Sequence, residues 1–254
     1  MVGILKGLGW FILYVMLMAL GQQMLVMVGS GESSLQAMSL YMEDHMLGIA
    51  AVSNLLVGLA FILLFCFRKK GIKTEWHLLP FKKNNLMYAV ILAFSYSLFA
   101  SLLTRNQSSV VGGMFGNSAD YYGALLGSVL KIINLLLLAP MVEEIALRGI
   151  VYTRIAEHSP AWAAILISGI LFGLMHFMAG GTVLVVNATI MGIILGFLLY
   201  RYDSLWICIV AHIAANLPEF LLLNTHKYPT SFIWILEAVS IGAAGYSLIK
   251  IVRN

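Results

Sequence analysis

Charged side chains are scarce in this chain, because Asp, Glu, Lys and Arg make up only 10% of its 254 residues while 61% are hydrophobic. So little charge argues against an ordinary water-soluble protein, whose residues are about one quarter charged. Apolar runs of about 20 residues, the length that crosses the hydrocarbon core of a bilayer, recur along the sequence. Alternating strands of the kind that build a membrane barrel are absent, so we expect an all-α, polytopic transmembrane helical bundle.

The basic residues predict how this bundle is oriented. With a cytoplasmic N-terminus, 12 of the 15 Lys and Arg residues fall on the cytoplasmic side, which predicts that both termini are cytoplasmic. The net charge of +4 follows from this topology and indicates no nucleic-acid partner. We expect about eight spans, near residues 8–28, 45–67, 85–103, 125–148, 160–178, 182–200, 204–223 and 231–251.

Several chemical signatures are also missing. The two cysteines, Cys66 and Cys208, form no CxxC pair, which argues against a disulfide framework and a cysteine metal site. No serine or cysteine lies beside His176 or His212 on the same helix face, so a covalent nucleophile is not supported. The chain has no HExxH motif, and it lacks the pseudo-symmetric halves typical of secondary transporters.

Against this apolar background, the stretch "PMVEEIALRG" at residues 140–149 places two carboxylates inside an expected span. An ionised side chain at mid-bilayer costs about 2.5 to 3.5 kcal/mol, so these residues need a compensating interaction. Glu144 and Arg148 are four residues apart on one helix face and are predicted to form an ion pair. Glu143 is turned away by about 100° and is left free. Pro140 is predicted to kink the helix, because it clashes with the carbonyl of Leu136.

Two further expected spans carry polar side chains at helical spacing. The fifth span ends in "LFGLMHF", which places Phe172 and His176 on one face ahead of the helix-breaking sequence "MAGG". The seventh contains "AHIAANLPEF", which places His212 and Asn216 on one face. Ionisable residues within membrane spans are rare and cluster at functional sites, so we expect these residues to act together.

This set of side chains suits the hydrolysis of an amide. A free carboxylate beside an imidazole can hold and deprotonate a water molecule, and a second imidazole with an asparagine amide can donate hydrogen bonds to an oxyanion. A zinc site is the alternative mechanism, with Glu143, His176 and His212 as its ligands, because two His and one Glu are a known catalytic set. The spacing of the residues does not choose between the two mechanisms.

The sequences "EEIALR", "FGLMH" and "HIAAN" match, in order, the EExxxR, FxxxH and HxxxN motifs of the CPBP family, also called the ABI family. This family contains the CAAX proteases and the bacteriocin-processing intramembrane proteases, and the resemblance runs from about Ala139 to Leu217. It implies an intramembrane endopeptidase with an all-helical core. It further implies that Glu143 activates water together with His176, that His212 and Asn216 stabilise the oxyanion, and that Glu144, Arg148 and Phe172 support them.

The resemblance divides the chain into a three-span region without a motif (1–122), a protease core (123–223) and a last span (224–254). It implies a multi-pass protein of a bacterial cytoplasmic membrane, surrounded by lipids, that cuts a peptide or a lipidated precursor. No cofactor is favoured, although zinc is possible, and the sequence does not indicate an oligomeric state. The alternatives are a non-enzymatic immunity or regulatory scaffold and a proton-coupled transporter.

Overall fold

A computed structural model describes residues 2–31, 34–104, 129–130, 132–221 and 229–253 of the chain. These residues form helices and no strand, which confirms the all-α prediction. Within the described ranges, five helical segments are long and apolar enough to cross a membrane: Val2–Ser30, Gly48–Cys66, Lys83–Leu103, Gly181–Tyr202 and Thr230–Arg253. The expected number of eight spans stays a prediction, because the other apolar helices in the described ranges are shorter.

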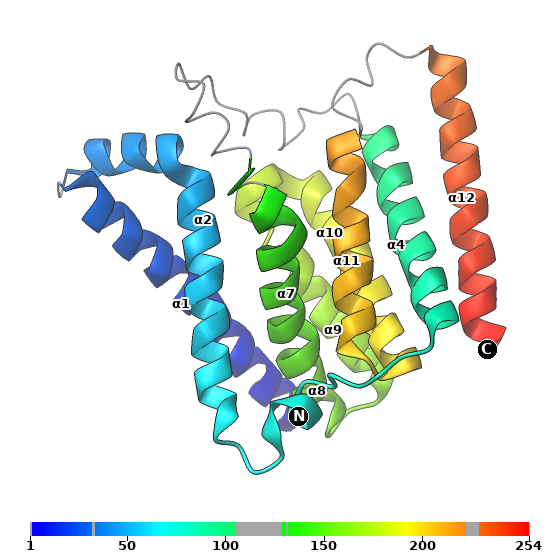
Figure 1. Cartoon of the computed structure of the whole chain (residues 1–254), viewed down its shortest axis with the longest axis horizontal. Coiled ribbons are helices and arrows are strands. Elements are labelled where there is room, and N and C mark those ends of the chain that lie inside the picture. The colour runs from blue at the N-terminus through cyan, green and yellow to red at the C-terminus, as the bar shows by residue number, and fades with distance from the viewer. Residues whose placement is uncertain (1, 32–33, 105–128, 131, 222–228, 254) are drawn as a thin grey trace.

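Helices α1 (Val2–Ser30) and α2 (Leu35–Cys66) pack together as one flank of the bundle. Helix α2 begins about ten residues earlier than the expected span, because Ser34 caps it by accepting a hydrogen bond from the backbone N–H of Ala37. Its first turns lie crosswise to the rest of the helix, so only the later part of α2 runs along the bundle (Figure 1). The short helix α3 (Gly71–Glu75) follows α2.

Helix α4 (Lys83–Leu103) lies between α11 (Leu205–Leu221) and α12 (Thr230–Arg253) and builds the opposite flank. Between the flanks runs a continuous helical path made of η1 (Asn134–Leu138), α7 (Ala139–Glu144), η2 (Ile145–Tyr152) and α8 (Thr153–Ala156). Both η segments are π-helical, with more than the usual 3.6 residues per turn. Helices α9 (Ala161–Leu174) and α10 (Phe177–Tyr202) lie behind α7 (Figure 1).

Helices α9 and α10 approach each other through glycines. A Cβ atom on Gly173 would lie 1.9 Å from Oγ1 of Thr189, and one on Gly192 would lie 2.8 Å from Cα of Gly169. Small residues allow such close backbone approach between membrane helices. The turn between the two helices lies at Met175 and His176, ahead of "MAGG". Helix α10 begins at Phe177 and includes "MAGG", but Gly181 within it has a left-handed backbone (φ 68°), so the regular helix is interrupted inside this sequence as predicted.

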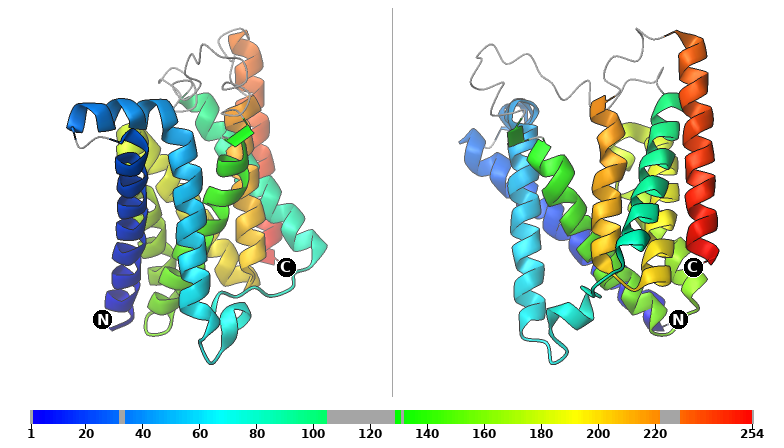
Figure 2. Two further views of the ribbon diagram at one scale, coloured as in Figure 1. Left: turned by 60° about the vertical axis from the view of Figure 1, so that its left-hand side comes forward. Right: turned by 45° about the vertical axis from the view of Figure 1, so that its right-hand side comes forward.

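Both ends of the chain lie at the same end of the bundle, as three views agree (Figures 1 and 2). The side of the membrane that this end faces stays a prediction. The expected domain boundaries at 122/123 and 223/224 fall outside the described residues.

Candidate active site

A π-turn leads into the two acidic residues. The N–H of Ala139 donates to the carbonyl of Asn134, a bond that spans five residues instead of the four of an α-helix. In this register the next N–H would come from residue 140 and would reach the carbonyl of Leu135, but Pro140 has no N–H to donate. From α-helical geometry, the sequence predicts that Pro140 affects the carbonyl of Leu136. In the π-turn the affected carbonyl is one residue earlier, at Leu135.

The ion pair predicted within the motif is present and is fully buried. Arg148 Nη1 donates to Oε1 of Glu144 across 2.9 Å, and both side chains have 0% exposure. Arg148 also donates through Nη2 to the carbonyl of Gly192 at 2.9 Å, and its guanidinium lies 4.7 Å from the centre of the Phe172 ring. Phe172 therefore supports the pair through a cation–π contact, in addition to its expected role beside a histidine.

His212 lies between the two carboxylates. Its Nδ1 is 2.9 Å from Oε1 of Glu144, and its Nε2 is 3.8 Å from Oε2 of Glu143. Because a carboxylate engaged with Arg148 accepts hydrogen bonds, Nδ1 of His212 carries the proton that it donates to Glu144. The structure thus brings Glu143, Glu144, Arg148 and His212 together from two helical paths.

The two adjacent acids differ in their access to water. The Glu143 side chain retains 14% exposure, whereas the Glu144 side chain has none. Arg148 contacts Glu144 rather than Glu143, as the helical spacing predicts. Glu143 is therefore the carboxylate that a water molecule can reach.

His176 reaches this group through Phe172. Its Nδ1 lies 2.8 Å from the carbonyl of Phe172, and the Phe172 ring contacts the rings of both His176 and His212, with centres 4.9 and 5.4 Å away. Because a carbonyl only accepts, Nδ1 of His176 carries a proton, and Nε2 is the acceptor nitrogen of the neutral ring. The expected pairing of His176 with Glu143 is not among the contacts of the described residues.

Asn216 lies one helical turn beyond His212, and its position links the site to the π-turn. Its amide Nδ2 donates to the carbonyl of Leu135 across 2.7 Å. This is the carbonyl that Pro140 leaves without its backbone donor. The amide carries a second N–H, which this bond does not use.

The zinc alternative stays a prediction. Within the described ranges, no group of three or more His, Cys, Asp and Glu side chains is placed to hold a metal ion. His176 is the member that stands apart, since its hydrogen bond goes to the backbone of Phe172.

Tyr14 of α1 is a residue near the site that the sequence motifs did not indicate. It is buried, with 2% exposure, and the charges of Glu143 and Glu144 both act on its phenol. Helix α1 runs antiparallel to α7 and η2 (Figure 1). A Cβ on Gly7 would lie 3.1 Å from the Val151 carbonyl, so these two residues are in close contact. Tyr14 lies seven residues after Gly7, and Glu144 lies seven residues before Val151. Because the two helices are antiparallel, Tyr14 and Glu144 are on the same side of this contact. In the sequence, Tyr14 could have been indicated by its position on the same helix face as Gly7, the small residue through which α1 approaches η2.

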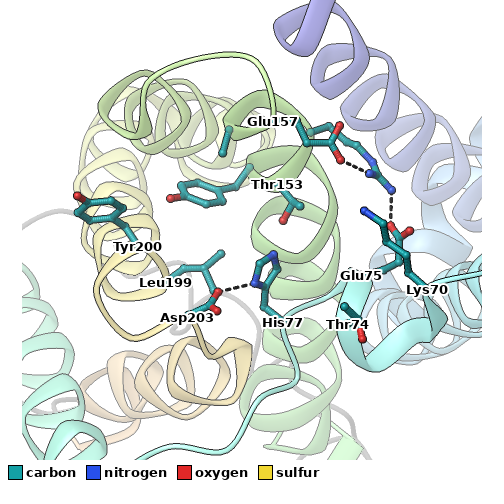
Figure 3. A pocket seen from close by; sticks show the side chains of 12 residues that line it. Lys70, Thr74, Glu75, His77, Thr153, Glu157, Leu199, Tyr200 and Asp203 are labelled. Carbon is teal, nitrogen blue, oxygen red and sulfur yellow. Dashed lines mark hydrogen bonds and ion pairs between the residues drawn. The ribbon is translucent and has the colours of Figure 1, made fainter.

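The cavity shown in Figure 3 lies away from these residues. It has a volume of about 470 Å³ at the end of the bundle where α3, α8 and the end of α10 meet, and none of the motif residues lines it. Most of its charged side chains are paired with one another: Arg154 with Glu75 and Glu157, and His77 with Asp203. This cavity is therefore distinct from the polar cluster around His212.

Residues 125–218 match the family model of the type II CAAX prenyl endopeptidases, described as Rce1-like. Comparison with curated proteins and comparison with solved structures each gave no match. The matched segment contains all three motifs, and together with the five long apolar helices among the described residues it points to a multi-pass membrane protein. This segment, rather more than a third of the chain, is therefore similar to the type II CAAX prenyl endopeptidases.

Proposed function

We propose that the chain hydrolyses a peptide bond in a membrane-associated peptide or protein precursor, with Glu143 as the residue that activates water. The observation that carries this proposal is the position of the His212 ring, 2.9 Å from Glu144 and 3.8 Å from Glu143. Glu144 is occupied by Arg148 and His212, which leaves Glu143 as the partly exposed carboxylate. A partly exposed carboxylate beside an imidazole group can accept a proton from water.

His176 is proposed to orient the attacking water. The bond from its Nδ1 to the Phe172 carbonyl fixes the neutral ring with a lone pair on Nε2, which can accept a hydrogen bond from water. His176 then contributes to positioning and Glu143 takes the proton. This division of roles requires the water to lie between the two side chains when substrate is bound.

The proposed reaction proceeds in two steps. Glu143 accepts a proton from water as the hydroxide oxygen bonds to the carbonyl carbon of the scissile peptide, which gives a tetrahedral oxyanion. The remaining N–H of Asn216 and Nε2 of His212 donate to this oxyanion, which requires a protonated His212 ring, since Nδ1 already donates to Glu144. Glu143 then gives its proton to the departing amine nitrogen as the C–N bond breaks.

The proposed substrate follows from the family and from the surroundings of the site. The matched family is named for CAAX prenyl endopeptidases, so we propose a prenylated precursor as the first substrate to test. A prenyl chain would partition into the lipid that surrounds the apolar helices, which raises its local concentration. Cleavage would then occur close to the membrane, where the three motifs lie.

The test compares the Glu143→Gln variant with wild type and with Glu43→Gln, which removes the charge of an exposed glutamate in α2. Each full-length protein is purified in detergent and incubated with a quenched fluorescent peptide that carries a prenylated CAAX end. We expect Glu143→Gln to abolish cleavage while its melting temperature stays near that of wild type. Glu43→Gln should cleave normally.

Full cleavage by Glu143→Gln would remove the water-activating role, and loss of folding in that variant would favour a structural scaffold. A chelator arm addresses the zinc alternative. We expect cleavage by wild type to continue after chelation, whereas inactivation that added zinc reverses would show a metal-dependent enzyme.

A further inference from the structure

A second cavity lies where α4 begins and α10 ends, and its walls carry positive charge without negative charge. Its volume is about 510 Å³, which falls in the range of small-ligand sites. Three cations and no acid occur among its lining residues, which are Lys82, Lys83, Asn84, Asn85, Arg201 and Tyr202. This composition differs from that of the cavity in Figure 3, whose cations and acids largely pair with each other.

The three cations have capacity to bind a ligand. Within the described part of the chain, the ammonium groups of Lys82 and Lys83 have no hydrogen-bond or ion-pair partner, and both residues are exposed. Arg201 uses Nε to donate to the carbonyl of Ile251 at 3.0 Å. The four N–H bonds of its two terminal nitrogens are not used by that contact, and a guanidinium binds phosphate oxygens in pairs.

The local backbone adds to this charge. Helix α4 begins at Lys83, and its cap residue Lys82 makes no side-chain hydrogen bond to the first turn. The first N–H groups of a helix carry partial positive charge and favour an anion. The acidic residue Asp203 directly follows the cavity residue Tyr202, but it does not line the cavity. Its backbone is left-handed (φ 50°), and its side chain contacts His77.

We propose that this cavity binds a phosphate-bearing anion, supplied either by the headgroup of an anionic lipid or by free phosphate. Both α4 and α10 are long and apolar enough to cross a membrane, and the cavity lies at the ends of both. Basic pockets between membrane helices at the interface are suited to anionic headgroups. This site is separate from the three motifs and does not depend on the proposed protease activity.

The test measures binding by the purified full-length chain in neutral detergent. The lipid probes are dioctanoyl phosphatidic acid and, as the zwitterionic control, dioctanoyl phosphatidylcholine; sodium phosphate and sodium chloride at equal ionic strength form the second pair. We expect saturable binding of phosphatidic acid and a Kd raised roughly tenfold or more in the double variant Lys82→Gln/Lys83→Gln. The matched control is Lys69→Gln/Lys73→Gln, which removes two exposed charges outside the cavity and should change the Kd by no more than roughly twofold.

The two sources of phosphate are distinguished by competition. If sodium phosphate displaces phosphatidic acid, the site takes the phosphate group alone; if it does not, the lipid is the ligand. Absence of saturable binding of either probe overturns the proposal. Equal weakening in the two double variants also overturns it, because that result indicates general surface charge. The exposed lysines are chosen because their replacement leaves the partly buried contact of Arg201 with α12 intact.

Discussion

The side-chain amide of Asn216 donates to the backbone carbonyl of Leu135 across 2.7 Å, at the one position of the π-turn where Pro140 cannot donate. A carbonyl left unpaired in an apolar interior costs about 1 to 3 kcal/mol. Asn216 therefore has a structural role at η1 in addition to the oxyanion role proposed for it. A single substitution at Asn216 would mix the two effects.

Combining Asn216→Ala with Pro140→Ala separates them. Alanine at 140 has a backbone N–H that can take over the Leu135 carbonyl, so we expect the double variant to regain the thermal stability that Asn216→Ala alone loses. Turnover should stay about 10² to 10³ lower in both, because one oxyanion donor is missing. Single-turnover cleavage and melting temperature measure the two quantities. Recovery of turnover along with stability would limit Asn216 to supporting the helix.

Removing the buried cation should destabilise the whole bundle. We expect Arg148→Met to lower the free energy of unfolding by about 3 to 5 kcal/mol, because Glu144 would remain buried without its counter-charge. The double variant Glu144→Leu/Arg148→Met should recover part of this loss, since no lone charge remains. Denaturant titration in detergent measures both. An Arg148→Met protein as stable as wild type would show that Glu144 is held by His212 alone.

The phenol of Tyr14 should affect catalysis more than folding. Tyr14→Phe keeps the ring that packs 6.1 Å from the Phe61 ring, so the melting temperature should hardly change. If the buried hydroxyl takes part in catalysis, its loss should lower turnover about tenfold, which corresponds to about 1.4 kcal/mol. Tyr96→Phe is the control, because that hydroxyl donates to the Asn187 carbonyl. Equal activity of the two variants would separate Tyr14 from the site.

The local part of this site is readable from the sequence, and the part between helices is not. Helical periodicity predicts the pair of Glu144 and Arg148, because a spacing of four residues fixes their face without knowledge of the fold. The contact of His212 with Glu144 depends on how α11 packs against α7, which no local pattern contains. The family motifs name His212 but do not indicate that it lies between the two acids.

The π-turns explain another difference. The sequence places the effect of Pro140 at Leu136, because an α-helix is the default geometry. The structure shifts it to Leu135 and supplies Asn216 as the donor. The break expected at "MAGG" is local: Gly181 takes a left-handed backbone, which glycine adopts without steric cost, while the helical hydrogen bonding of α10 begins before it at Phe177.

The π-helical segment η1 also determines how α7, with Glu143 and Glu144, is rotated about the helix axis. A π-turn contains one residue more than an α-turn, so deleting a single residue between 134 and 138 would return the path to α-helical geometry. Glu143 and Glu144 would then swing together by about 100° about the helix axis, away from His212. The number of residues before Pro140 thus determines the direction in which this helix presents its acids. An insertion or deletion there would rotate both acids about the helix axis.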